Sequence, residues 1–211
     1  MFEYLAMRLF HVTETVKMNG LRSLLNEVIY TKRIAVPVEM DLSGFKPSLK
    51  WPNDNSFKCI EINHEVLDQS DYSYKFKNRK LKASRNIKKG LCGYGLLRND
   101  EVIADLWYSS PTISPGSPEH KDLIWLGIAP RENYAYAFDM FLVPEMRGQN
   151  IATCFQGSFL LYLRDHGIDW AYGYYWADNL QALWVHRLLK WKELGKLKVS
   201  RFLVIKRVWR E

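Results

Sequence analysis

The sequence predicts a mixed α/β fold in which helices pack on a central group of strands. Two apolar runs in "GLCGYGLLRNDEVIADLWYSS" flank the turn-forming residues "RNDE" and indicate a β-hairpin. The apolar segment "NYAYAFDMFLVP" reads as a long strand, and an amphipathic helix over 149–166 follows it at once. "DWAYGYYW" indicates a further strand directly after that helix.

The remaining elements are predicted from shorter patterns. The first thirty residues suggest one or two helices, broken near Gly20. Proline at position 37 inside the strand predicted over 33–42 indicates an edge strand or a bulge. A short strand is expected over 57–62, a partly helical segment over 75–89, a helix over 180–194 capped by Asp178 or Asn179, and a closing strand over 199–209.

Composition limits the possible classes of protein. The 211 residues suit one compact domain, and 47% hydrophobic residues with eight Trp exclude a disordered chain. No signal-peptide pattern and no membrane-spanning window occur, so we expect a cytoplasmic chain with no membrane partner. Three distant cysteines and five histidines without ligand spacing give no support for a disulfide framework or a metal site.

The formal charge of +7 comes from one segment, residues 75–89. This segment holds eight Lys and Arg and no acid, and without these eight the chain has 22 basic and 23 acidic residues, counted from totals of 30 and 23. A solvated helix face is the simplest interpretation. A docking surface for a phosphate or an acidic protein is the second interpretation, and nucleic acid is the least favoured.

The segment "LVPEMRGQNIATCFQGSFLLYL", residues 142–163, runs from a strand through a tight loop into a helix. Such a geometry aims free backbone N–H groups and the positive end of the helix dipole at one point, which attracts phosphate. Gly148 relieves crowding in the loop and Arg147 offers a charge. From the residues alone, an ordinary strand-to-helix connection that binds nothing fits equally well.

This segment resembles the acyl-CoA-binding motif of the GNAT acyltransferase superfamily, in which a strand leads into a loop of the form (Q/R)-x-x-G-x-(G/A). Asn150 stands where the family usually has glycine, and Asn is the residue that best tolerates glycine-like left-handed backbone. "DNLQALWVHRLLKW" is similar to a later family helix with the pattern N-x-x-A-x-x-x-Y-x-x-x-G-F. Asn179 and Ala182 match it, His186 replaces the tyrosine, and Lys190 replaces the glycine.

The resemblance implies a largely antiparallel sheet with helices on both faces and a cleft where the family's fourth and fifth strands splay apart. It covers about residues 88–205. The extended N-terminal region, residues 1–87 of the same single domain (1–211), would shape the acceptor side. Acetyl-CoA or another acyl-CoA would lie in the cleft as co-substrate. Its expected binding residues are Phe141, Leu142, Val143, Arg147, Gly148, Gln149, Asn150, Ile151, Ala152 and Asn179.

The family reaction is direct attack of an amine on the thioester, so one group must take a proton and another must assist the departing thiolate. Asp139 is the candidate base, because family members often carry an acid at this place; pairing with a basic neighbour is the alternative. His186 is the candidate acid or second base, since imidazole titrates near neutral pH. A buried histidine of the core is the alternative, because the apolar residues Ala182, Val185 and Leu189 would lie on the same face of the helix. Asp105 and Glu132 are lesser acidic candidates, and Tyr172, Tyr174, Tyr175 and Trp176 belong to the core or line the cleft.

The predicted function is therefore transfer of an acetyl or longer acyl group from acyl-CoA to the amine of a small molecule. An acyl carrier protein docked on residues 75–89 is an alternative donor, with Lys80, Lys82 and Arg85 as contacts. A binding protein that kept the GNAT fold without catalysis is an alternative of a different class. No hydrolase, kinase or redox motif competes with these interpretations.

Overall fold

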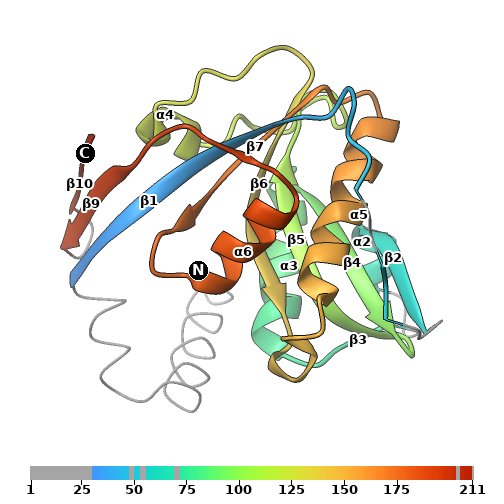
Figure 1. Cartoon of the computed structure of the whole chain (residues 1–211). Helices are drawn as coiled ribbons and strands as arrows, with labels where there is room; N and C mark the ends of the chain where they lie inside the picture. Colours follow the sequence, from blue (N-terminus) through green and yellow to red (C-terminus); the bar gives the residue numbers. More distant parts are fainter. Residues whose placement is uncertain (1–29, 48–49, 53–55, 69–71, 203–204, 211) are drawn as a thin grey trace.

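The computed structural model describes residues 30–47, 50–52, 56–68, 72–202 and 205–210 (Figure 1). The helices expected in the first thirty residues fall on residues 1–29, which lie outside the described residues. The helical elements are α2 (His64–Asp68), α3 (Lys77–Lys88), α4 (Asp122–Leu126), the 3-10 turn η1 (Pro144–Met146), α5 (Ile151–Asp165) and α6 (Leu180–Leu188).

The described strands form one sheet with the main order β10-β9-β1-β7-β6-β5-β4-β2, with β3 beside β5 and β8 beside β1. The β6–β7 and β3–β5 pairs are parallel and the other pairs are antiparallel. This mixed, largely antiparallel sheet confirms the predicted fold class. The strands are β1 (Tyr30–Asp41), β2 (Phe57–Ile62), β3 (Ser73–Tyr74), β4 (Cys92–Arg98), β5 (Glu101–Ser109), β6 (Tyr134–Leu142), β7 (Trp170–Trp176), β8 (Lys192–Glu193), β9 (Leu197–Phe202) and β10 (Ile205–Arg210).

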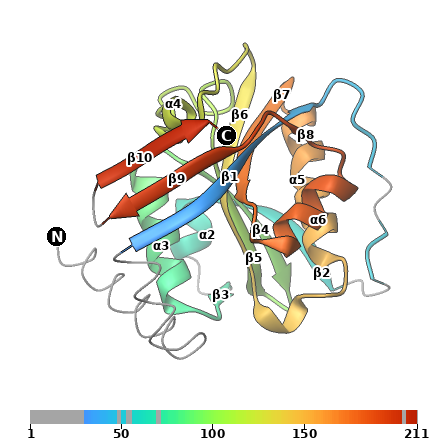
Figure 2. The ribbon, with the colours of Figure 1, turned by 60° about the vertical axis from the view of Figure 1, so that its left-hand side comes forward.

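Helices cover both faces of the sheet, with α2 and α3 on one side and α5 and α6 on the other (Figure 2). Successive side chains of a strand point to opposite faces of the sheet, so each face has its own hydrophobic core. Phe155 and Phe159 of α5 pack in one core with Tyr108 of β5, whereas the preceding residue of β5, Trp107, packs in another core with Ala83 of α3. α4 packs with β6, β7 and β9 in a third core.

Pro37 lies in the interior of the sheet, so the predicted edge position is wrong. β1 pairs with β7 along one side, and Pro37 lies opposite Tyr174. On its other side β1 pairs with β9 up to Ala35 and with β8 from Val38. Pro37 falls in the gap between these two partners, where a missing N–H removes no ladder hydrogen bond.

Two predicted boundaries are also wrong near the C-terminus. The helix expected over 180–194 ends at Leu188, and Lys190 has φ 62, which is incompatible with a continuing helix. The closing strand expected over 199–209 is a pair of antiparallel strands, β9 and β10. The central hairpin is as predicted: Asn99 and Asp100, both with positive φ, join β4 to β5.

Candidate active site

The parallel strands β6 and β7 separate after a short common stretch. They pair only from Tyr134 to Tyr136 on β6 and from Trp170 to Tyr172 on β7. Beyond this point β6 still pairs with β5 as far as Leu142, and β7 still pairs with β1 as far as Trp176. Beyond this stretch the facing edges of β6 and β7 are not hydrogen-bonded to each other, which confirms the predicted separation of the two strands.

Gly173 lies at the point where the strands separate. A Cβ atom at this position would lie 3.1 Å from the carbonyl oxygen of Ala137 on β6, which is too close for an ordinary contact. Glycine therefore favours the close approach of the two backbones before they diverge.

A cleft of about 1030 Å³ is lined by both strands and by side chains from both faces of the sheet. Seven of the ten predicted cofactor-binding residues line it: Phe141, Leu142, Arg147, Gly148, Asn150, Ala152 and Asn179. Of the other three, Val143 and Ile151 are buried and Gln149 is exposed. Thr153 and Gln156 of α5 line the same cleft and were missed by sequence reasoning.

The loop that precedes α5 has the glycine-like geometry expected of a phosphate-binding turn. Gly148 has φ 88, with no atom near its missing side chain. Asn150 has φ 61 and ψ 3, so it adopts the left-handed conformation that glycine adopts most easily. The substitution of asparagine for the family's glycine therefore preserves the backbone of the turn. Its side chain makes no capping hydrogen bond, and helix geometry leaves the first amides of α5 without intrahelical acceptors.

Arg147 is turned back toward the strand that precedes the loop. Its Nε and Nη2 atoms donate to the carbonyl oxygen of Leu142 at 3.3 and 3.2 Å. Because Leu142 is the last residue of β6, this contact fixes the loop relative to the free edge of that strand.

His186 of α6 lines the cleft and carries its proton in a defined place. Its Nδ1 lies 2.7 Å from the carbonyl oxygen of Ala182; since a carbonyl only accepts, Nδ1 is the donor and Nε2 has a free lone pair. Burial lowers the pKa of His186 and outweighs the opposing effects of this hydrogen bond and of Glu193. The imidazole ring stacks on Tyr175 with ring centres 5.0 Å apart. Asn179 caps the same helix by accepting from the Ala182 amide at 3.1 Å.

Asp139 lies at a bulge in β6. Asp105 pairs with Phe141 and Trp107 pairs with Phe138, so β6 has one residue more than β5 across this interval. Asp139 has φ 53 within it. Its carboxylate contacts two cations of α3: Lys82 Nζ at 2.7 Å and Arg79 Nη1 at 3.2 Å.

Arg79 also forms a buried ion pair with Asp105, so two acids and two bases make a balanced cluster. Burial alone would raise the pKa of Asp139, but the charges and hydrogen bonds of Arg79 and Lys82 outweigh it and lower that pKa. Asp105 is therefore part of the support for the cleft wall. Glu132, the other lesser acidic candidate, is exposed and does not line the cleft.

The two predicted catalytic residues reach the cleft from opposite faces of the sheet. Asp139 contacts α3, whereas His186 packs on Tyr175, which belongs to the core around α5. Tyr174 and Trp176 point to the other side and belong to the core around α4. Tyr174, Tyr175 and Trp176 all line the cleft, while Tyr172 is buried.

Asp122, at the start of α4, lines the cleft beside Phe138, Tyr174 and Trp176. No sequence signal pointed to this acid, because it follows a proline-rich loop in a short helix and its cleft neighbours are distant in sequence. It gives the α4 side of the cleft a carboxylate surrounded by aromatic rings.

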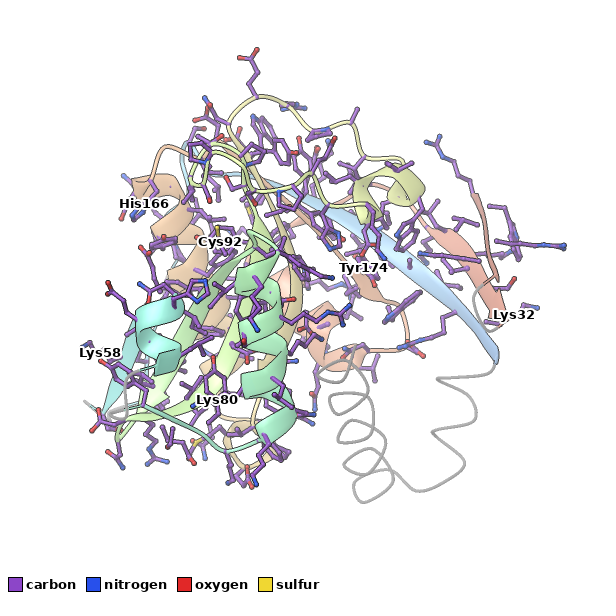
Figure 3. All side chains as sticks on the ribbon, turned by 180° about the vertical axis from the view of Figure 1, so that it is seen from behind. Lys32, Lys58, Lys80, Cys92, His166 and Tyr174 are labelled. Carbon is purple, nitrogen blue, oxygen red and sulfur yellow. The ribbon has the colours of Figure 1, made fainter. Side chains whose placement is uncertain are left out.

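The basic segment 75–89 is less available than its composition suggests. α3 accounts for most of it, as expected, but Arg79 and Lys82 bind the acids described above and Lys75 pairs with Glu145 at 2.9 Å. Lys80 is exposed on α3 (Figure 3). Docking of an acyl carrier protein on this segment stays a prediction.

Within the described ranges, no group of three or more His, Cys, Asp and Glu side chains is arranged to hold a metal ion. None of the helices described has the length and apolar composition needed to cross a membrane. Cys154, predicted to be a core thiol, is buried and is not part of a disulfide.

Solved structures of low sequence identity share this architecture. A GCN5-related glucosamine N-acetyltransferase region of a fungal multi-domain GH3 β-N-acetylglucosaminidase matches with TM-score 0.57 and 16% identity, over 90% of this chain and 23% of that one. A tandem GNAT protein from the clavulanic acid biosynthesis pathway matches with TM-score 0.53 and 13% identity, over 86% and 57% of the two chains. The chain has the GNAT fold.

A GCN5-related N-acetyltransferase from Sphaerobacter thermophilus has the same GNAT fold, with TM-score 0.51 and 9% identity over 91% of this chain and 57% of that one. The present chain thus spans 57% or less of the length of each of these three proteins. No family model matches the sequence, and no curated protein matches it.

Proposed function

We propose that this GNAT-fold chain is an N-acyltransferase that moves an acetyl or longer acyl group from acyl-CoA to the amine of a small molecule. The observation that carries the proposal is one cleft lined both by the loop before α5, with its free helix amides, and by polar and aromatic side chains from the other face of the sheet. A long, narrow co-substrate with a phosphorylated end and a reactive end fits such a passage. The N-acetyltransferase names of the similar structures support the same reaction class.

The residues that line the cleft could bind both parts of an acyl-CoA, its charged pyrophosphate and its neutral extended arm. The α5 amides, Gly148 and Asn150 would hold its pyrophosphate. The backbone edge of β6 at Phe141 and Leu142, with the side-chain amide of Asn179, would bind the extended arm by hydrogen bonds. Val143 is not available for this role, because its N–H donates to the Ile103 carbonyl oxygen and its own carbonyl oxygen accepts from the Met146 amide. Arg147 would act mainly by fixing the loop, since its guanidinium is bound to the strand.

In the reaction, the amine nitrogen forms a bond to the thioester carbonyl carbon, the carbon–sulfur bond breaks, and one proton goes to the sulfur. Because the amine is an ammonium ion at neutral pH, a second proton is released to water. His186 is well suited to accept a proton: its imidazole is neutral and its Nε2 lone pair is free. It could return that proton to the departing thiolate from the same side of the sheet as α5 and α6.

Asp139 is proposed as the second catalytic group, on the acceptor side of the cleft. Its carboxylate is held ionised by Arg79 and Lys82, which lowers its basicity and already neutralises its charge. Of the two residues, His186 is therefore the stronger candidate for proton transfer.

The test is calorimetric titration with CoA, acetyl-CoA and a long-chain acyl-CoA, comparing the natural chain with Gly148→Trp. We expect binding at micromolar concentration that is lost in the variant, because a bulky residue at φ 88 distorts the loop. Absence of binding to all three, or equal binding by the variant, would overturn the proposed site. Thiol release with a panel of amines then separates an enzyme from a binding protein that kept the fold.

A further inference from the structure

The two ends of the cleft differ in chemistry. The end near α5 has the candidate phosphate-binding turn, whereas the end near α4 presents Asp122 with the rings of Phe138, Tyr174 and Trp176. Figure 3 shows Tyr174 below α4, on the face that also carries α2 and α3. If acyl-CoA occupies the α5 end, the α4 end is where the acceptor must enter.

The Asp122 carboxylate is held in place by neutral donors. Trp125 Nε1 donates to its Oδ1 at 2.7 Å, and the Tyr136 hydroxyl donates to its Oδ2 at 3.4 Å. His120 Nδ1 lies 3.7 Å from the same carboxylate. Burial lowers the pKa of His120 and outweighs the opposing effect of Asp122, so the imidazole is neutral at pH 7. Among the described residues, no cation in contact balances the charge of this carboxylate.

Aromatic rings surround this charge and attract cations through their faces. Tyr174 meets Trp125 edge to face at 5.2 Å and Trp176 at 5.3 Å, so the rings form a continuous wall. Two of these rings already hold a cation of the chain itself: Lys206 Nζ lies 3.0 Å from the Trp125 ring centre, and Arg33 lies over Trp176 at 4.6 Å. A carboxylate within such a wall is the chemistry that recognises an organic ammonium group.

We propose that the acceptor carries a second cationic group and that Asp122, with Phe138, Tyr174 and Trp176, binds this group at the α4 end of the cleft. The inference rests on the proposed function and names its substrate class: a diamine or polyamine of which one nitrogen is acylated. The bound cation is not the reacting nitrogen, because the attacking amine must lose its proton and a site that stabilises positive charge would oppose that loss. Asp122 is a specificity residue, remote from proton transfer.

Titration of the protein, in the absence and in the presence of CoA, with α,ω-diaminoalkanes of increasing length, each compared with the monoamine of equal length, tests this inference by binding alone. A charge-assisted contact predicts that at least one diamine binds about tenfold or more tightly than its monoamine. Asp122→Asn, which keeps an acceptor for Trp125, should abolish the difference. Glu119→Gln, a matched loss of charge at an exposed residue outside the cleft, should retain it.

Tyr174→Leu is a second variant, since it removes one ring and leaves the Asp122 hydrogen bonds intact; it should also reduce the preference. Equal affinity for diamines and monoamines in the natural chain, or an unchanged preference in Asp122→Asn, would overturn the inference. These results are distinguishable from failure of the proposed function. Diamine binding that depends on Asp122, without any acyl-CoA binding, would support the cation site and contradict the proposed acyltransferase function. Acyl-CoA binding without a preference for diamines would support the proposed function and contradict the cation site.

Discussion

The carboxylate of Asp139 lies 2.7 Å from the ammonium group of Lys82, across the boundary between the sheet and α3. Arg79, one turn earlier on the same helix, contacts the same carboxylate and also pairs with Asp105. Both acids come from adjacent strands beside the β6 bulge. The cluster therefore joins α3 to the strand that forms one wall of the cleft.

Asp139→Asn should lower the free energy of unfolding by about 2 kcal/mol, because it leaves Lys82 without its partner and leaves the buried Arg79 with Asp105 alone. Asp178→Asn is the control: it breaks an exposed pair with Arg33 and should cost less than about 1 kcal/mol. Urea denaturation of both variants measures the difference. Since the folded-state pKa of Asp139 is lowered, its contribution is present above the ordinary value of 3.8 and is lost as the pH falls through the folded-state pKa. Equal, small losses in the two variants would contradict a structural role.

Replacement of Asn150 tests whether CoA binding at the turn before α5 depends on the left-handed backbone conformation of residue 150. Asn150→Gly should bind CoA at least as well as the natural chain, because glycine adopts φ 61 without strain. Asn150→Val should bind about tenfold more weakly, since a β-branched residue in this conformation costs roughly 1–2 kcal/mol. Calorimetric titration with CoA compares the two. Equal affinities would show that the conformation of residue 150 does not control the site.

The features of the fold and site that were predictable from sequence are those fixed by neighbouring residues. The β4–β5 turn contains Asn99 and Asp100, which accept positive φ, and the β6–loop–α5 connection carries Gly148 and Asn150 in the same conformation. In both places local residue types determine the backbone. The turn itself was therefore predictable from local residues, whereas the preference for phosphate binding over an ordinary connection came from the resemblance to the GNAT motif.

The features that were missed depend on partners that are distant in the sequence. Asp122 is separated from Tyr174 by more than one helix and one strand, and only the packing of α4 brings it to the cleft. Pro37 was misplaced because the two strands that pair with β1 on either side of it, β9 and β8, are distant from it in the sequence. The ion pairs of Asp139 depend on where α3 packs against the sheet, and no local sequence pattern specifies that position.

Gly173→Ala tests the close approach of β6 and β7 before they separate. The added Cβ would meet the Ala137 carbonyl oxygen at 3.1 Å, and we expect a loss of about 1 kcal/mol or more in the free energy of unfolding. Gly44→Ala is the control, because its Cβ would have no atom within 4 Å. Thermal unfolding of the two variants measures the effect. A Gly173→Ala variant as stable as Gly44→Ala would mean that the strands separate without this constraint.

His186→Gln tests proton transfer in the cleft. If His186 accepts a proton through Nε2, the variant should lose about 10²-fold to 10⁴-fold in kcat, measured by thiol release. Because the pKa of His186 is lowered from 6.5 and the residue must be unprotonated to act, its protonation should lower kcat/KM of the natural chain only below pH 6.5, separately from the dependence on the pKa of the amine. The acid limb due to His186 should disappear in the variant. His166→Gln is a matched control, since His166 Nδ1 also lies 2.7 Å from a carbonyl four residues earlier, that of Tyr162, but the residue is exposed and outside the cleft. A similar loss in both variants, or an acid limb that survives in His186→Gln, would assign the proton transfer to another group.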